Sequence, residues 1–345
     1  MFEKASLDDL KSFYFGHAQD EAASTGCSVF IAPQGGACGV DVRGGGPATR
    51  ETDLLKPENM IQDVHAIVLS GGSAFGLEAS CGVMEALAER KIGFELGGAY
   101  VPIVVGACLF DLLVGDAVWP NKEMGHAAAD AAFAQGEGIS KDMFAQGNVG
   151  AGCGATVGKF DGGAHAMKSG FGWHCLRKGD LVVAAFVAVN ALGNVCDKDG
   201  TWIAGMRTDD GLVSSPLSFF ASKQDEKNDS CVRGEYSSNL CTNTTIGAVL
   251  TNARLTKAQA TKMSSTVHDA YARAIKPVHS SNDGDTVFTF ASREVEAPFD
   301  LVAIIATEAM QNAIISAVKN AKSAFGLPSA SDITKGVHQL AQKKY

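Results

Sequence analysis

The sequence predicts a mixed α/β fold, and three observations support this. Its 345 residues are 46% hydrophobic and 19% charged, as in a globular chain with a sizeable buried core. Apolar runs rich in β-branched residues, at 181–195 and from residue 244 on, have the length and composition of buried strands. Segment 256–275 has apolar residues at helical spacing, which indicates a helix with one apolar face.

In the first part of the chain, strands are expected at the end of 16–32, at 39–43 and at 65–70. The second runs into the glycine turn 44–46, which lets a backbone pass close to another segment or a ligand. A simple tight turn is an equally good interpretation.

Residues 71–76 (GGSAFG) follow the strand at 65–70 and precede a predicted helix that ends near residue 90. A phosphate-binding P-loop would need Lys and Ser or Thr where Leu77 and Glu78 stand, and a nucleophile elbow would need glycine in place of Phe75. The glycine spacing also differs from a dinucleotide fingerprint. What remains is a helix start whose N–H groups could face a carboxylate or carbonyl, with ordinary close packing as the favoured interpretation.

The second part of the chain begins with a predicted helix at 122–135 and the glycine-dense segment 150–158, which leads to Lys159. Strands at 167–177 and 181–195 are joined by a hairpin turn, and Asn190 ends the buried run. Residues 207–242 form a long polar connection, a natural place for cleavage. Beyond residue 244, Thr256 and Gln259 fit a capping box, a strand is expected at 287–290, and Asp300 is expected to cap a second helix that ends near residue 322.

Charge and cysteine content exclude several classes of function. The net charge is −9 and the pI about 5.4, so a nucleic-acid partner is not expected. Nine cysteines without a Cys-x-x-Cys pair argue against a disulfide framework and a thiolate zinc site, and they indicate a reducing, cytoplasmic location. The longest uncharged apolar run, 181–196, contains two asparagines and is too short for a membrane span.

The junction at Asn243 and Thr244 carries the functional hypothesis. There the polar connection stops and a β-branched, apolar run begins. If the chain were cut before Thr244, this residue would gain a free amine beside its hydroxyl, and the amine could act as general base for the nucleophile. An α-amino group titrates near ~7.7–8.0, which suits that task at neutral pH. A loop followed by an ordinary core strand explains the same residues if the wider sequence is ignored.

The wider sequence resembles the self-processing aminopeptidase family, which includes L-aminopeptidase/D-esterases, β-peptidyl aminopeptidases and a nylon-oligomer hydrolase branch. Six ordered blocks carry the resemblance: 39–55 (GVDVRGGGPATRETDLL), 66–78 (AIVLSGGSAFGLE), 148–159 (NVGAGCGATVGK), 187–193 (VAVNALG), 243–247 (NTTIG) and 274–288 (AIKPVHSSNDGDTVF). The junction at 243–247 and the Asp-Gly-Asp loop are similar to the nylon-oligomer hydrolase branch in particular.

The resemblance implies one catalytic domain, an αββα sandwich of the N-terminal-nucleophile type with the connectivity of this family and of ornithine acetyltransferases. It also implies cleavage into an α chain (1–243) and a β chain (244–345) that stay together, with αβ units forming a homo-oligomer and with no cofactor or metal.

By matching position, Thr244 would be the nucleophile and Asn190 would help hold the oxyanion. Asp283 and Asp285 would orient the Thr244 amine and hydroxyl, and Lys159 would lie near the nucleophile. Some relatives have a tyrosine where Phe110 stands, and Phe110 cannot donate a hydrogen bond from its side chain.

Other interpretations of these residues stay open. Asn190 could make a structural hydrogen bond, and Lys159 could be a solvated surface charge. Asp283 and Asp285 could belong to an ordinary turn or, less favourably, to a metal site. The predicted substrates are short peptides, amino-acid amides or esters, or linear amide oligomers. An acyltransferase of the same fold and an uncleaved binding protein are the alternatives.

Overall fold

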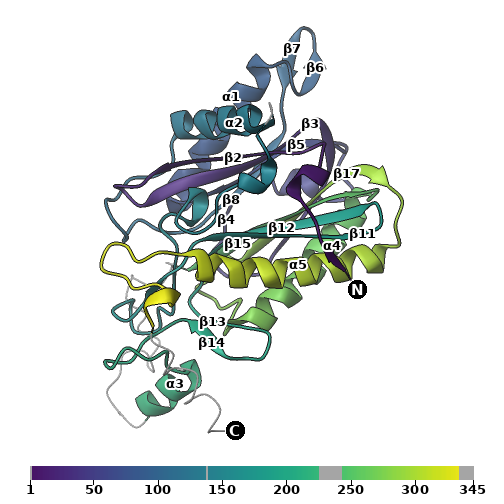
Figure 1. The fold of residues 1–345 in the computed structure, drawn as a ribbon. Coiled ribbons are helices and arrows are strands. Elements are labelled where there is room, and N and C mark those ends of the chain that lie inside the picture. The colour runs from purple at the N-terminus through teal and green to yellow at the C-terminus, as the bar shows by residue number, and fades with distance from the viewer. Residues whose placement is uncertain (1, 137–138, 225–242, 334–345) are drawn as a thin grey trace.

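A ten-stranded sheet folded into two packed layers dominates the computed structural model, which describes residues 2–136, 139–224 and 243–333 (Figure 1). The long strand β3 (Thr25–Val42) belongs to both layers. Its residues 25–31 pair with β2 and β5, whereas residues 37–42 pair with β17. One layer contains, besides this second part of β3, the strands β1 (Glu3–Lys4), β11 (Phe171–Lys178), β12 (Leu181–Asn190), β15 (Thr244–Ala253) and β17 (Thr286–Val295). The other contains β2 (Tyr14–Asp20), the first part of β3, β5 (Val64–Ser70), β8 (Val104–Cys108) and β4 (Ala48–Arg50).

Two pairs of helices cover the outer faces and complete the αββα sandwich that the resemblance implied. Helices α1 (Ala79–Glu89) and α2 (Lys122–Gly136) pack on the layer of β2 and β5, and α4 (Lys257–Ala274) and α5 (Phe299–Asn320) pack on the other layer (Figure 1). Three separate hydrophobic clusters fill the interfaces between these four layers.

Strand β12 explains why the sequence had a continuous apolar run there. Its odd-numbered residues from Leu181 to Val189 contact the cluster beneath α4 and α5, whereas Val182, Ala184, Phe186 and Ala188 contact the cluster between the layers. Because successive side chains point to opposite faces and both faces are buried, no polar alternation appears. The predicted hairpin between β11 and β12 is confirmed.

The covering helices largely follow their sequence signals. Thr256 and Gln259 form the predicted capping box at the start of α4. The expected cap at Asp300 is wrong: Pro298 is the N-cap of α5, and Asp300 lies in the first turn, where its charge favours the positive end of the helix dipole. By length and composition α5 could cross a membrane, but 67% of its most apolar window is buried in the fold, as expected of a core helix.

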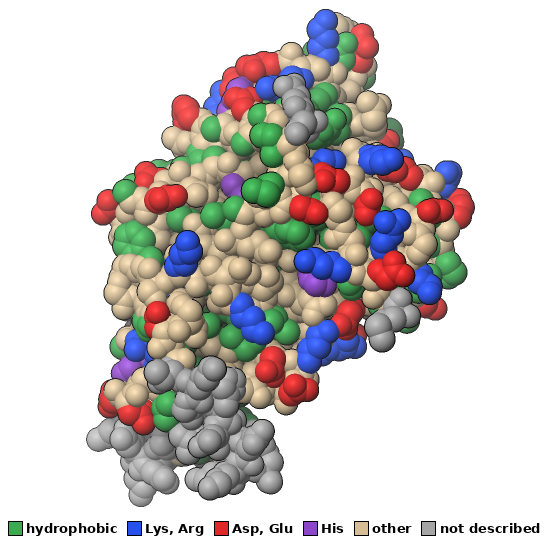
Figure 2. All heavy atoms as spheres, in the orientation of Figure 1, with side chains coloured by type: hydrophobic (Ala, Val, Ile, Leu, Met, Phe, Trp, Pro, Cys, Tyr) green, Lys and Arg blue, Asp and Glu red, His purple; other side chains and the backbone are tan. Residues whose placement is uncertain are grey.

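Smaller elements lie around the sandwich. They are the strand pairs β6 (Phe94–Leu96) with β7 (Ala99–Val101) and β9 (Thr156–Val157) with β10 (Met167–Lys168), and the set β13 (Asn194–Cys196), β14 (Trp202–Ala204) and β16 (Ile275–Lys276). The described part of the polar connection contains helix α3 (Pro216–Gln224), and residues 225–242 lie outside the described residues. On the face drawn in Figure 2, basic side chains are interspersed with acidic ones and do not form a single-sign stripe.

Candidate active site

Thr244 is the first residue of β15, which lies between β12 and β17 in the sheet. In the antiparallel pairing with β12, Thr244 is directly opposite Asn190, so both side chains lie on the same face. An isolated bridge pairs Asn243 with Asp283 in the loop before β17. The register of three neighbouring strands therefore brings Asn190, Thr244 and the 279–285 loop together, and all of these residues are buried except part of that loop.

The peptide carbonyl that precedes Thr244 accepts two hydrogen bonds. The hydroxyl of Thr244 donates to the carbonyl oxygen of Asn243, and the backbone N–H of Gly284 donates to the same oxygen at 3.0 Å. An N–H aimed at a carbonyl oxygen stabilises the negative charge that develops there when the carbon is attacked. A Cβ at position 284 would lie 2.7 Å from Thr244 Oγ1, so only glycine fits without displacement.

The two carboxylates of the Asp-Gly-Asp loop have different partners. Asp283 accepts hydrogen bonds from the backbone N–H and hydroxyl of Ser280, at 2.8 and 2.6 Å, and from the N–H of Leu192 at 3.4 Å. Asp285 accepts the N–H of Thr245 at 2.7 Å. In this continuous chain Asp285 thus holds the residue after Thr244, whereas the Asp283 carboxylate holds Ser280 and Leu192. That both carboxylates orient the free amine of Thr244 stays a prediction about the cleaved form.

The glycine turn at 44–46 lets the acidic loop lie close to β3. The N–H of Gly46 donates to the carbonyl oxygen of Asp283 at 2.9 Å. A Cβ at Gly44 would lie 2.2 Å from that oxygen, and one at Gly45 would lie 2.5 Å from the carbonyl oxygen of Ser281. The close approach for which Gly44 and Gly45 are needed is therefore to the 279–285 loop of the same chain.

Asn190 is fixed by bonds at both ends of its amide. Its Oδ1 accepts hydrogen bonds from Lys159 Nζ at 2.8 Å and from the N–H of Thr156 at 3.0 Å, and its Nδ2 donates to the carbonyl oxygen of Phe110 at 2.8 Å. Lys159 Nζ also donates to the backbone oxygen of Asn190 at 3.1 Å. Lys159 is only 8% exposed, so the alternative of a solvated surface charge is excluded.

Burial shifts the ionisation of two groups near Thr244. Desolvation lowers the pKa of Lys159 to about 7, against the opposing effect of Asp283 and Asp111. Burial raises the pKa of Asp283, and the charge of Asp285 raises it further. A lysine whose pKa lies near neutrality can give or take a proton at working pH, and such shifts are typical of functional sites.

A cavity of about 260 Å³ opens beside the peptide bond. Asn243 and Lys159 line it, together with the apolar side chains of Phe110, Leu113, Phe325 and Leu327. Phe110 contributes an apolar wall here, and the polar group it supplies to the site is its backbone carbonyl. The size suits a small ligand with a mainly apolar body.

The segment at 71–76 donates a backbone hydrogen bond to the carboxylate of Asp111. Its helical part starts as a 3-10 helix, η3 (Ser73–Glu78), and the N–H of Gly72 donates to Asp111 Oδ1 at 2.7 Å. Thr25 Oγ1 donates to Asp111 Oδ2 at 2.8 Å, and burial raises the pKa of Asp111 to about 6. The N–H of Gly72 is thus used by an internal acid that sequence reasoning missed, and the N–H of Ser73 donates to the carbonyl oxygen of Leu109 at 2.8 Å.

The structure places every predicted site residue at one end of the sheets, around the Asn243–Thr244 bond. Sequence reasoning missed the Gly284 N–H and the Asp111 carboxylate. Their only signal in the sequence is adjacency, since Gly284 lies between the two predicted aspartates and Asp111 follows Phe110. Among the described residues, no group of three or more His, Cys, Asp or Glu side chains could hold a metal ion.

Comparison with solved structures identifies the fold. A β-aminopeptidase from Burkholderia superposes with a TM-score of 0.67 at 16% identity, covering 98% of this chain and 96% of that one. The L-aminopeptidase D-Ala-esterase/amidase of Ochrobactrum anthropi, described as a variant of the Ntn hydrolase fold, superposes with a TM-score of 0.62 at 14% identity, covering 93% and 88%. The chain therefore has the fold of the N-terminal-nucleophile (Ntn) hydrolases.

The chain belongs to peptidase family S58, whose family model matches residues 6–330. An uncharacterized aminopeptidase of Mycobacterium leprae is 36% identical over 94% of this chain and 92% of its own length. A 6-aminohexanoate-oligomer endohydrolase of Paenarthrobacter ureafaciens is 32% identical over 84% of this chain and 76% of its own length. The protein is thus a hydrolase that acts on amide bonds.

Proposed function

We propose that the chain cleaves itself between Asn243 and Thr244 and then uses Thr244 as an N-terminal nucleophile to hydrolyse amide bonds. The observation that carries this proposal is the environment of the bond: the Thr244 hydroxyl lies against the Asn243 carbonyl oxygen, which also accepts the Gly284 N–H. A hydroxyl and a polarised carbonyl on adjacent residues are the two reactants of an N-to-O acyl shift.

In the self-cleavage step, Thr244 Oγ1 forms a bond to the Asn243 carbonyl carbon while the C–N bond breaks. The hydroxyl proton passes to the nitrogen, which becomes the free amine of Thr244. Water then hydrolyses the resulting ester, which leaves a carboxylate on Asn243 and restores the hydroxyl. The Gly284 N–H stabilises the oxyanion that forms when Oγ1 adds to the Asn243 carbonyl carbon.

In turnover, the Thr244 amine takes the proton of its own hydroxyl as Oγ1 attacks the substrate carbonyl. The substrate C–N bond breaks, the leaving amine takes the proton, and water hydrolyses the acyl-enzyme. Asn190 helps hold the oxyanion, because its amide lies directly opposite Thr244 in the sheet and is fixed by Lys159 and Phe110. Asp283 and Asp285 orient the new amine.

The proposed substrates are short peptides, amino-acid amides or esters, and linear amide oligomers. The names of the relatives, aminopeptidase and 6-aminohexanoate-oligomer endohydrolase, support this range. The cavity beside Asn243 supports a small, largely apolar acyl part, because the acyl group of a substrate must take the place that Asn243 occupies before cleavage.

Purified wild type, Thr244→Ala and Thr244→Ser test the proposal on denaturing gels and by intact-mass measurement. We expect two fragments from the wild type with the new N-terminus at Thr244, one full-length band from Thr244→Ala, and slower cleavage in Thr244→Ser. A panel of α-peptides, β-peptides and aminohexanoate oligomers then identifies the substrate. Full activity from an uncleaved wild-type chain would refute the proposal.

A further inference from the structure

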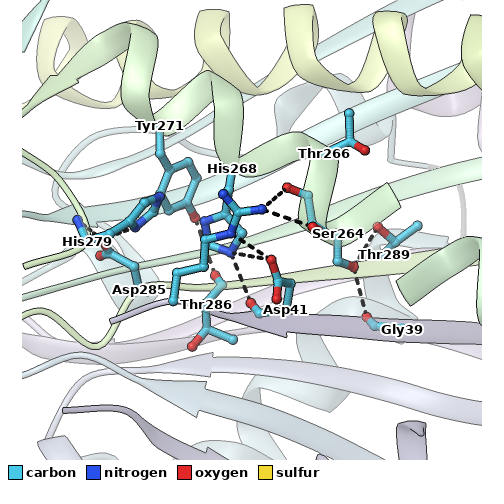
Figure 3. A network of polar contacts seen from close by, with 12 residues as sticks. Gly39, Asp41, Ser264, Thr266, His268, Tyr271, His279, Asp285, Thr286 and Thr289 are labelled. Atoms are coloured by element: carbon cyan, nitrogen blue, oxygen red, sulfur yellow. Dashed lines mark hydrogen bonds and ion pairs between the residues drawn. The ribbon is translucent and has the colours of Figure 1, made fainter. Parts of the chain in front are cut away.

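His279, in the loop between β16 and β17, makes two hydrogen bonds to one oxygen of Asp285 (Figure 3). Its backbone N–H donates to Asp285 Oδ2 at 3.1 Å, and its ring Nδ1 lies 2.8 Å from the same atom. The other oxygen, Oδ1, accepts the backbone N–H of Thr245. Asp285 therefore connects His279 to the residue that follows Thr244.

The ring proton of His279 belongs on Nδ1. Asp285 is fully buried, and each of its oxygens already accepts a backbone N–H, Oδ1 from Thr245 and Oδ2 from His279 itself. Nε2 of His279 is buried and has no hydrogen-bond partner within the described part of the chain. A proton on Nε2 would thus lose its hydration without compensation, whereas a proton on Nδ1 is donated to Asp285.

Neighbouring rings hold His279 in place (Figure 3). The ring of His268 lies 4.7 Å away edge-on, and the ring of Tyr271 lies 5.9 Å away and nearly parallel. Burial lowers the pKa of His268 to about 4, so it is a neutral packing partner at neutral pH. The backbone of His279 has a φ of 57°, in the left-handed region that few residues other than glycine adopt and in which asparagine, aspartate and histidine are enriched. Packing and backbone together give the ring one direction, toward Asp285.

We infer that His279 is a positioning residue for the proposed reaction: it holds the Asp285 carboxylate, which holds the backbone at Thr245 and so fixes how Thr244 presents its hydroxyl and amine. The inference rests on the proposed role of Thr244. His279 bonds to Oδ2 while Thr245 bonds to Oδ1, so it acts through Asp285 and not on the reacting carbonyl.

Three substitutions separate hydrogen bonding from packing and backbone effects. His279→Asn places an amide N–H close to the position of Nδ1 and tolerates a positive φ. His279→Gly accepts this backbone conformation and keeps the backbone N–H but removes the ring donor. His279→Gln is closer to histidine in size, but its amide lies beyond the Nδ1 position. Full-length chains made by cell-free translation are followed on denaturing gels for cleavage before Thr244, so no external substrate is needed, and thermal melting checks folding.

We expect His279→Asn to cleave within about threefold of the wild-type rate and the Gly and Gln variants about ten- to hundredfold more slowly, as for the loss of one hydrogen bond to a charged group. Wild-type rates in the Gly and Gln variants, with Thr244→Ala uncleaved, would overturn the inference and leave the proposed function standing. Faster cleavage in Gln than in Asn would indicate a packing role and also overturn it. Cleavage of Thr244→Ala at the same bond would refute the proposed function itself.

Discussion

At the scale of single residues, the candidate site depends on backbone groups as much as on side chains. The Gly284 N–H donates to the carbonyl of Asn243, and the Phe110 carbonyl accepts from Asn190. Both contributions come from the backbone, so the side chain of Phe110 is not needed for its bond. Position 284 differs in one respect, because it must have no side chain. Its missing Cβ leaves the space that Thr244 Oγ1 occupies.

Gly284→Ala should therefore slow self-cleavage at least about tenfold, because the added methyl group displaces the Thr244 hydroxyl or the oxyanion donor. Its Cβ would lie 2.7 Å from Thr244 Oγ1 and 2.8 Å from the Gly46 carbonyl oxygen. Gly46→Ala is the matched control, since its nearest contact would be 3.9 Å away. Cleavage is timed from cell-free synthesis, and equal rates in the two variants would contradict the assigned geometry.

At the scale of elements, the sequence predicts which segments form strands and helices better than it predicts where they end and with what they pair. The run at 181–190 and the capping box at Thr256 are local signals, so they were predictable. The division of β3 between two layers and the bond from Thr245 to Asp285 depend on register and packing between distant segments. The junction in the sequence indicated Thr244 and the resemblance assigned a role to Asn190, whereas the bonds of His279 and Asp111 could be found only in the structure.

Lys168 of β10 shows how one buried cation stabilises a glycine-rich element. Its Nζ donates to the carbonyl oxygens of Gly152, Ala155 and Ser169, at 3.3, 3.0 and 2.7 Å. These bonds fix the segment that leads to Thr156, which in turn bonds to Asn190. Burial lowers the pKa of Lys168 to about 7.

This shift predicts a pH-dependent stability. An unfolded lysine titrates near ~10.4, so between about pH 7 and that value the unfolded chain holds a proton that folded Lys168 has lost. The free energy of unfolding should consequently rise as the pH is raised through this window. Lys168→Met should lower stability by about 3 kcal/mol, since three buried carbonyls lose a donor, and it should flatten this rise.

The measurement is denaturant unfolding at pH 7 and pH 9 in the uncleaved Thr244→Ala background, which keeps the chain in one piece. Lys262→Met, at an exposed position of α4, is the control for removing a lysine without such bonds. An identical pH dependence in the Lys168→Met and parent chains would contradict the assignment.

At the scale of the whole molecule, the position of the proposed cut decides whether the two chains can stay together. Thr244 starts a central strand, so cleavage before it leaves the ten-stranded sheet complete. Strand β15 keeps β12, from the α chain, on one side and β17, from the β chain, on the other. Helix α5 of the proposed β chain covers β11 and β12 of the proposed α chain, and α4 packs on β3 and β17. Both helices share one hydrophobic cluster with β11 and β12.

We therefore predict that the two chains stay together after cleavage without a covalent link. On size exclusion under native conditions both fragments should elute in one peak, at the mass of a 35.8 kDa unit or, given the expected homo-oligomer, a multiple of it. They should separate only in denaturant, because parting them exposes the hydrophobic cluster beneath α4 and α5 and breaks the pairing of β12 with β15. A reducing agent should not separate the two chains, since the cysteines in the described ranges form no disulfide. Elution of the β chain alone under native conditions would contradict this arrangement of the sheet.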